Sequence, residues 1–233
     1  MKTLAELDAM VDDVLRVQWS RREGRKVPEV EQLALTGNVG VEIEATVLYA
    51  DLAQSSALVE GYADWFAAEM IKIFLMCAAE VVRNNDGVIT AYDGDRVMGI
   101  FTGDFKNSNA AKCGLQINYA ITKIVNPKLA ARYPKSLYAI RHGVGIDTSS
   151  LLAARTGVRA ANDLAWVGTA ANDAAKLSSL RHADNATYIS SSVYQRLNDL
   201  SRLGGDPRRD MWTEFVWEEK SEKAYRSSWW WRL

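Results

Sequence analysis

A tight turn between two short apolar segments constrains the fold of this chain more than any other feature of its sequence. Residues 88–92 and 96–102 flank the tripeptide Asp93-Gly94-Asp95. An Asp-Gly pair between two such segments is a strong signal for a β-hairpin. The sequence therefore predicts two antiparallel strands that meet at this turn, with a carboxylate on each side of the glycine.

Strand-like and helical patterns lie on both sides of the hairpin. Residues 42–52 resemble a strand that enters a covered sheet, and apolar residues over 58–83 have the spacing of one long helix or a broken pair. After the hairpin, residues 110–125 predict a helix that ends before Pro127, and residues 137–146 a further strand. The order strand, helix, hairpin, helix, strand indicates an α+β fold with helices packed on a mostly antiparallel sheet.

The two ends of the chain lie outside this pattern. Residues 3–19 have the spacing of an amphipathic helix that opens on a capping box, and residues 21–28 form a basic connector. We therefore divide the chain into an N-terminal helix and connector, residues 1–40, and a main domain, residues 41–233. The tryptophan-rich C-terminus is expected to form a closing hairpin or a dimer contact.

Composition and charge exclude several classes of partner. With 48% hydrophobic and 24% charged residues among 233, the chain fits one ordinary folded domain. A formal net charge of −1 gives no electrostatic basis for binding nucleic acid or a membrane surface, and the longest apolar run is too short to span a bilayer. Cys77 and Cys113 are isolated and no leader is recognisable, so we expect a cytoplasmic protein. His142 and His182 lack metal-ligand spacing, and no zinc site is expected.

Two carboxylates are candidates for chemistry. Asp51 comes at the end of an otherwise apolar strand, where a charge requires compensation. Asp95 lies in the hairpin turn, so both could meet at one edge of the sheet and share hard divalent cations. Taken singly, Asp51 could equally be a strand-end cap and Asp95 an ordinary turn residue.

Three segments, taken in order along the chain, resemble the signature segments of class III adenylyl and guanylyl cyclase domains. They read ATVLYADLAQSS, GVITAYDGDRVMGIF and WVGTAANDAAKL. The resemblance covers roughly residues 41–233. It implies a ferredoxin-like βαββαβ core with the N-terminal helix appended. It also implies an enzyme that closes a nucleoside triphosphate into a 3′,5′-cyclic monophosphate and releases pyrophosphate.

The resemblance implies a role for each matching residue. Asp51 and Asp95 would hold two divalent cations, Mn²⁺ or Mg²⁺, and the backbone carbonyl of Leu52 would be a third contact. Asn172 and Lys176 stand where the family keeps an Asn and an Arg that orient the ribose and stabilise the transition state. In the family this pair comes from the partner subunit, which implies a homodimer with two shared sites. Lys176 departs from the family's arginine, because a lysine cannot form the bidentate hydrogen bonds to two oxygens that an arginine forms.

The base-reading positions also depart from the purine cyclases. Ala91 and Ala165 stand where the adenylyl type has a Lys and an Asp, so both purine-reading groups are absent. Tyr49 lies two residues before Asp51, so on a strand both face the nucleotide. A phenol there would shorten the pocket and favour a pyrimidine, although it could also be simple packing. Arg96 is a weaker candidate, because it follows Asp95 directly and neighbouring strand residues point to opposite faces.

This combination is most similar to the stand-alone pyrimidine cyclases of bacterial Pycsar anti-phage defence. That resemblance implies UTP or CTP as substrate and a separate effector activated by the cyclic nucleotide. We favour UTP, because no acidic side chain is placed to accept from the cytosine amino group. The alternatives are an adenylyl or guanylyl cyclase and a non-catalytic nucleotide-binding module of the same fold. Ser150 stands where the family often has an arginine that binds the triphosphate, so the residues that bind the triphosphate here are unassigned.

Overall fold

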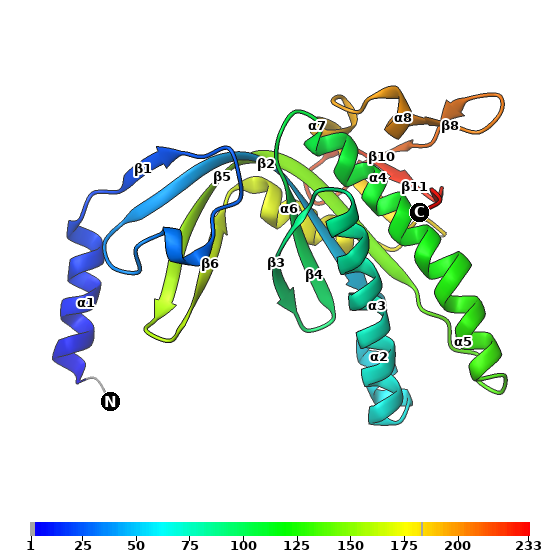
Figure 1. Cartoon of the computed structure of the whole chain (residues 1–233), viewed down its shortest axis with the longest axis horizontal. Coiled ribbons are helices and arrows are strands. Elements are labelled where there is room, and N and C mark those ends of the chain that lie inside the picture. The colour runs from blue at the N-terminus through cyan, green and yellow to red at the C-terminus, as the bar shows by residue number, and fades with distance from the viewer. Residues whose placement is uncertain (1–2, 183) are drawn as a thin grey trace.

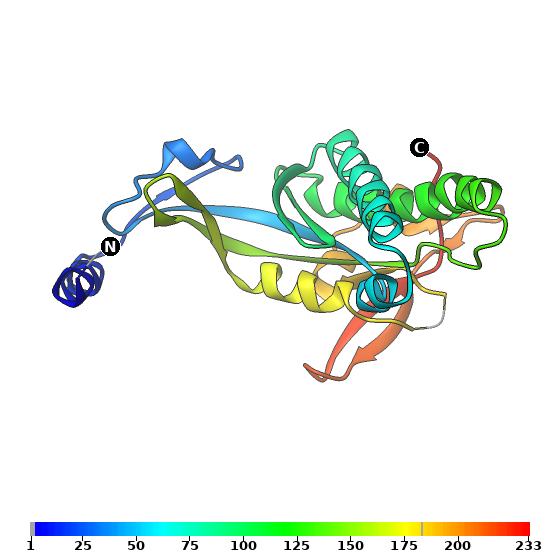
Figure 2. The ribbon, with the colours of Figure 1, turned by 90° about the horizontal axis from the view of Figure 1, so that it is seen from below.

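A computed structural model describes residues 3–182 and 184–233, and it shows one long sheet with helices on both of its faces (Figures 1 and 2). Two long strands, β2 (Val39–Leu52) and β5 (His142–Val158), form the centre of the sheet. They pair antiparallel along almost the whole of β2. The predicted α+β fold is thus confirmed.

The main sheet has nine strands in the order β10-β11-β7-β5-β2-β4-β3, with β1 beside β2 and β6 beside β5. β1 pairs parallel with β2 and β7 parallel with β5, and the other pairs are antiparallel. The remaining strands are β1 Ser20–Glu23, β3 Val88–Asp93, β4 Arg96–Phe101, β6 Ala161–Val167, β7 Thr187–Ser190, β10 Thr213–Trp217 and β11 Glu222–Ser227. A separate two-stranded ribbon consists of β8 Leu203–Gly204 and β9 Arg209–Asp210.

The predicted hairpin is present as β3 and β4, which pair antiparallel around Gly94. Gly94 has a φ of +60°, a conformation that glycine adopts without the steric cost of a side chain. The turn therefore holds Asp93 and Asp95 at the same end of the sheet as the C-terminal end of β2.

Helices cover the two faces of the sheet unequally. α3 (Asp64–Asn84) and α4 (Lys106–Tyr119) pack on one face, which the figures show as the helical layer above the sheet. α6 (Thr169–Ser178) packs on the other face. The other helices are α1 Leu4–Arg16, α2 Ser55–Gly61, α5 Asn126–Arg132, α7 Ser191–Tyr194 and α8 Asp199–Arg202, with a 3-10 turn at Val30–Gln32 and a π-helical segment at Ala120–Val125.

Successive side chains of β2 point to opposite faces of the sheet, so the strand contributes to the apolar core on both faces. Leu48 and Ala50 are buried under α3 and α4, whereas Val47 belongs to the apolar cluster beneath α6. Side chains two residues apart on a strand share a face, so Tyr49 and Asp51 lie on the α6 side. The expectation that these two residues share a face is confirmed.

α6 lies unusually close to β5 because β5 has glycine where the helix crosses it. A Cβ atom on Gly145 would come within 2.1 Å of the Ala174 carbonyl oxygen, and one on Gly143 within 2.2 Å of that of Ser178. Side chains at these two positions would therefore push the helix away from the sheet.

Three predicted boundaries are wrong. The helix predicted to end before Pro127 continues as the π-helical segment and α5, and Pro127 lies near the start of α5, directly after the π-helical segment. The strand predicted over residues 137–146 begins at His142 and runs on to Val158. The predicted basic connector contains β1, which pairs with β2. Among the described residues, no helix is both long enough and apolar enough to cross a membrane.

Candidate functional site

Asp51 is a buried carboxylate that two arginines compensate. It is only 6% exposed, near the C-terminal end of β2. The Arg96 Nε atom lies 3.4 Å from one carboxylate oxygen, and an Arg181 terminal nitrogen lies 2.9 Å from the other. Burial raises the pKa of the Asp51 carboxyl; Arg96 and Arg181 oppose this effect, and the Asp95 charge adds to it. The surroundings of the Asp51 carboxylate therefore favour a positively charged group next to it.

The hairpin turn brings Asp95 to the same place. The backbone N–H of Leu52 donates to the Asp95 carbonyl oxygen at 3.3 Å, and Asp51 lies opposite Arg96 in the β2–β4 register. The structure thus brings Asp51, Leu52 and Asp95 together. The nearby Asp95 charge contributes to the raised pKa of Asp51.

The donor set suits a hard divalent cation that also binds a phosphate. Carboxylate and carbonyl oxygens are the ligands that Mg²⁺ and Mn²⁺ prefer. Residues 3–182 and 184–233 contain no cluster of three or more His, Cys, Asp or Glu side chains that could hold a metal alone. Asp51 and Asp95 therefore fit a cation whose remaining ligands come from a substrate and water, as is usual for Mg²⁺ with nucleotides.

Cross-strand pairing arranges the candidate base-reading residues in rows on the α6 face. Tyr49 lies opposite Met98, and Met98 lies opposite Ala91, so these three residues form one row across β2, β4 and β3. Asp51 and Arg96 belong to the next row. Burial raises the pKa of the Tyr49 hydroxyl, while the charge of Arg96 lowers it. The Arg96 charge thus affects both Tyr49 and Asp51. Arg96 therefore lies on the same side of the sheet as these two residues, although its place directly after Asp95 predicted that it would point to the opposite face.

Ala165 lies on β6 and pairs with Ala154 of β5. Its neighbours Leu164 and Trp166 line a cavity of about 220 Å³ together with Ile89 and Thr90, which directly precede Ala91. Leu164, Trp166, Ala91 and Tyr49 also pack against the same apolar cluster. The structure therefore places the Ala165 segment of β6 next to the Ala91 segment of β3.

Asn172 and Lys176 lie on the outer face of α6. Both are exposed, while Ala170, Ala174 and Leu177 form the helix face that is buried against the sheet. In the described part of the chain, neither makes a hydrogen bond or an ion pair with Asp51 or Asp95. A single chain therefore brings together only part of the predicted site.

The turn between β10 and β11 contacts this part of α6 through two ion pairs. Lys176 forms an ion pair with Glu219, and Lys220 of the same turn forms one with the buried Asp173. Lys220 has a raised pKa, for which the hydrogen bond to Asp173 is the main cause. Both ion pairs thus connect this turn to the helix that presents Asn172 and Lys176.

Arg181 is a site residue that the sequence analysis missed. It follows α6 in a polar stretch that has no periodic pattern, so only the fold reveals that its side chain reaches Asp51. The same guanidinium lines a cavity of about 240 Å³ behind β5, together with Arg141, Asp184 and His142. His142 is buried, and burial with the nearby Arg181 charge lowers its pKa to about 4, so it is neutral near pH 7.

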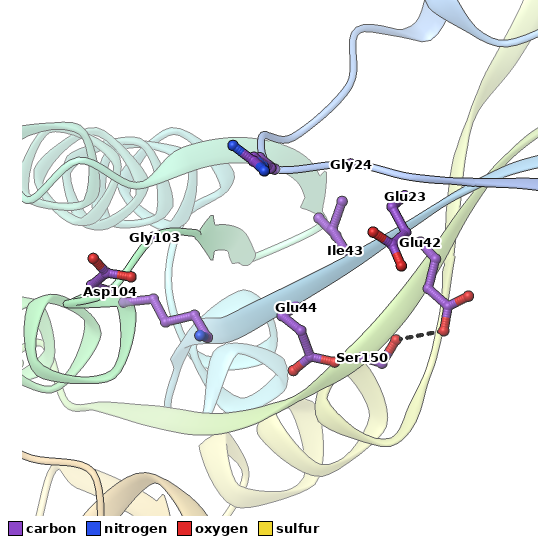
Figure 3. A pocket seen from close by; sticks show the side chains of 10 residues that line it. Glu23, Gly24, Glu42, Ile43, Glu44, Gly103, Asp104 and Ser150 are labelled. Carbon is purple, nitrogen blue, oxygen red and sulfur yellow. Dashed lines mark hydrogen bonds between the residues drawn. The ribbon is translucent and has the colours of Figure 1, made fainter.

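A further cavity does not include Asp51. It measures about 650 Å³, and Ser150 lies in its wall (Figure 3). Its charged lining residues are the four carboxylates Glu23, Glu42, Glu44 and Asp104 and the two cations Arg25 and Lys106. The Ser150 hydroxyl donates to Glu42 at 3.0 Å. The carboxylates outnumber the cations, so the lining is net negative and disfavours a triphosphate.

Comparison with solved structures defines the class of protein. The crystal structure of a guanylyl cyclase superimposes with a TM-score of 0.66 at 19% identity, covering 81% of this chain and 92% of that one. The adenylyl cyclase CyaB from P. aeruginosa gives a TM-score of 0.66 at 17% identity, with 80% and 94% coverage. The fold is that of the class III nucleotidyl cyclases. No family model matches the chain.

Comparison with curated proteins identifies the family to which the chain belongs. The chain is 44% identical to a uridylate cyclase from Xanthomonas perforans, over 98% of this chain and 97% of that protein. It is 42% identical to a uridylate cyclase from Burkholderia cepacia, over 98% of each. The chain belongs to this family of nucleotidyl cyclases and is a nucleotidyl cyclase itself.

Proposed function

We propose that this enzyme cyclises a pyrimidine nucleoside triphosphate, UTP in preference to CTP, to the 3′,5′-cyclic monophosphate with release of pyrophosphate. The row formed by Tyr49, Met98 and Ala91, next to the row of Asp51 and Arg96, is the observation that carries this proposal. The names of the relatives, which are uridylate cyclases, support it independently.

The row of Tyr49 favours a small base for two reasons. Tyr49 is bulky and half-buried on the face that Asp51 shares, so it shortens the space available beyond the ribose. Ala91 has no polar group with which to read a purine. Arg96 only donates hydrogen bonds, and uracil has two carbonyl oxygens that accept them, whereas cytosine has one and carries an amino donor. This difference supports UTP over CTP.

Asp51, Asp95 and the Leu52 carbonyl would hold two divalent cations. When bound, such cations lower the pKa of the ribose 3′-hydroxyl and neutralise the triphosphate. Asn172 of a second copy would orient the ribose, and Lys176 would meet the negative charge that develops on the phosphate as pyrophosphate leaves. The exposure of Asn172 and Lys176 on α6, away from their own chain's core, supports a homodimer with two shared sites.

A substrate panel tests the proposal. Purified protein is incubated separately with ATP, GTP, CTP and UTP in the presence of Mn²⁺, and 3′,5′-cyclic products are quantified by mass spectrometry. We expect cyclic UMP as the main product and cyclic CMP as a minor one. A purine product alone would refute the pyrimidine assignment and leave an adenylyl or guanylyl cyclase.

Substitutions of Tyr49 should change base selectivity. Tyr49→Phe removes one hydroxyl, so we expect kcat/KM for UTP to fall by about tenfold, the usual loss for a hydrogen bond of this kind. Tyr49→Ala should lengthen the pocket and lower the ratio of UTP to ATP turnover further. The measurement is kcat/KM for both substrates. Equal losses for UTP and ATP in both variants would mean that Tyr49 only packs.

Removal of the Arg181 guanidinium should strengthen metal binding. Arg181 occupies one oxygen of Asp51, so we expect Arg181→Gln to raise the affinity for Mn²⁺ by about three- to tenfold. Free Mn²⁺ is measured by electron paramagnetic resonance without nucleotide. Arg141→Gln is the matched control, because Arg141 lines the same cavity without an ion pair to Asp51 among the described residues. Weaker binding in Arg181→Gln would mean that Arg181 supports the cation site.

The biological role that we propose is synthesis of a second messenger in the cytoplasm during anti-phage defence. A cyclic nucleotide diffuses, so the responding effector is a separate protein. Cys77 and Cys113 are both free, which fits a reducing compartment. The test is the cyclic UMP content of cells that express the wild type or an inactive variant, before and after infection. A constant level throughout infection would argue against a defence role.

A further inference from the structure

The N-terminal helix α1 presents an apolar face that nothing in its own chain covers. All of its residues are described and none is buried. Leu7, Met10, Val11 and Val14 follow helical spacing and are between 40% and 58% exposed. In Figure 1, α1 extends from the end of the sheet away from the helical layer. Such a surface on a soluble helix indicates an interaction site.

The helix is held rigidly in this exposed position. Its N-terminus carries the predicted capping box formed by Thr3 and Glu6. At its C-terminal end, the amide of the buried Asn38 donates to the carbonyl oxygens of Val14 and Val17, at 2.7 and 2.6 Å. Asn38 directly precedes β2, so α1 is fixed to the start of the central strand.

An exposed aromatic groove lies at the other end of the molecule. Tyr62, Trp65, Phe66 and Tyr133 line a cavity of about 610 Å³ at the start of α3 and the end of α5. Their rings contact one another, with Phe66 and Tyr133 centroids 5.2 Å apart. Trp65 is 61% exposed and Tyr62 41%. Exposed aromatic clusters of this kind are typical of the anchor sites of protein interfaces.

The two surfaces have opposite charge. α1 carries Glu6, Asp8, Asp12 and Asp13 against the single cation Arg16. Arg132 and Lys135 stand on the rim of the aromatic groove, where the Arg132 guanidinium lies 5.5 Å from the Tyr133 ring centre. An amphipathic helix with an apolar face and acidic flanks is the complement of an aromatic groove with a basic rim.

We propose that α1 of one copy docks in the aromatic groove of a second copy. The helix cannot reach its own groove, because Asn38 fixes it at the start of β2, and β2 alone spans about 46 Å. Two antiparallel copies make this contact twice and form a closed dimer. The inference rests on the proposed homodimer, in which α6 of one copy completes the Asp51 site of the other.

Variants of exposed residues test the contact without threatening the fold. We expect Val11→Glu and Trp65→Ala each to weaken dimerisation by about tenfold or more in sedimentation velocity. The double variant should be little worse than either single one, because both remove the same contact. Met76→Glu is the matched control: Met76 is 57% exposed on α3 outside the groove, and its variant should dimerise as the wild type does.

A cross-link identifies the partners directly. A zero-length carbodiimide joins a lysine to a carboxylate in contact, so the full-length protein should give a Lys135 link to an α1 carboxylate. In a mixture of ¹⁴N- and ¹⁵N-labelled protein, this link should join light to heavy peptides and disappear in Lys135→Ala. A stable dimer without this link and with unchanged affinity in Val11→Glu would overturn the inference alone. A wild type that remains monomeric would overturn the proposed homodimer as well.

Discussion

Replacement of Asp51 by asparagine should reduce cyclisation by about three orders of magnitude, the loss expected when a group that organises transition-state charge is removed. Asparagine has the shape of aspartate without its charge, so the position would keep its packing while losing its attraction for a cation. Steady-state formation of cyclic product from UTP measures the effect. Mn²⁺ binding without nucleotide should be weakened in the same variant.

Stability must be separated from chemistry in this experiment. Asp51→Asn leaves Arg96 and Arg181 without their carboxylate partner, but both guanidinium groups are partly exposed and can be hydrated. We therefore expect the melting temperature to change by only a few degrees. Asp86→Asn is the matched control, because Asp86 is a turn residue with φ +64°, a conformation that asparagine also accepts. Full activity in Asp51→Asn would refute the catalytic assignment.

Lys176→Ala should reduce kcat by about two to three orders of magnitude with a small effect on folding, because the side chain is exposed and makes only a surface ion pair. Lys176→Arg restores a cation and should retain most of the activity. The matched control is Lys223→Ala, which removes a comparable surface pair with Glu214. If Lys176→Ala is fully active, Lys176 is merely a solvated surface residue.

A mixture of two inactive variants tests whether the site is shared between subunits. In a heterodimer of Asp51→Asn with Lys176→Ala, one of the two sites combines an intact Asp51 with an intact Lys176. After random subunit exchange, half of the dimers are mixed, so we expect about a quarter of wild-type activity. Homodimers of either variant alone should stay inactive. No recovery, with exchange verified by mass, would mean that Asp51 and Lys176 act within one chain.

The proximity of Asp51 and Asp95 could be predicted from the sequence, because local sequence signals determine where both residues lie. The Asp-Gly turn fixes where β3 meets β4, and the strand period fixes the face that Tyr49 and Asp51 share. The row of Tyr49, Met98 and Ala91 depends further on strand register, which one sequence does not reveal. Arg181 could not be predicted at all, since its contact with Asp51 depends on how closely α6 packs on β5.

The missed boundaries have a similar cause. β5 passes from apolar residues into Asp147, Thr148, Ser149 and Ser150, where composition no longer indicates a strand, although β2 and β6 pair with it. Tertiary pairing therefore overrides a weak local pattern. The tryptophan-rich end was expected in a closing hairpin or a dimer contact. The hairpin is present as β10 and β11, but residues 229–231 follow it, and the dimer contact stays a prediction. The Trp231 N–H donates to the Leu115 carbonyl oxygen of α4 at 3.1 Å.

Gly143 and Gly145 of β5 make the position of α6 independent of the side chains that line the opposite part of β2. Gly145 lies opposite Tyr49 and Gly143 opposite Asp51, and at both positions the backbone of α6 fills the space that a side chain would take. The position of α6 is thus set by main-chain contact and does not depend on which side chain stands at position 49. If Tyr49 reads the base and Lys176 acts in catalysis, as we propose, substitutions at position 49 would alter the choice of base while Lys176 stays in place, and substrate preference could then diverge without loss of activity.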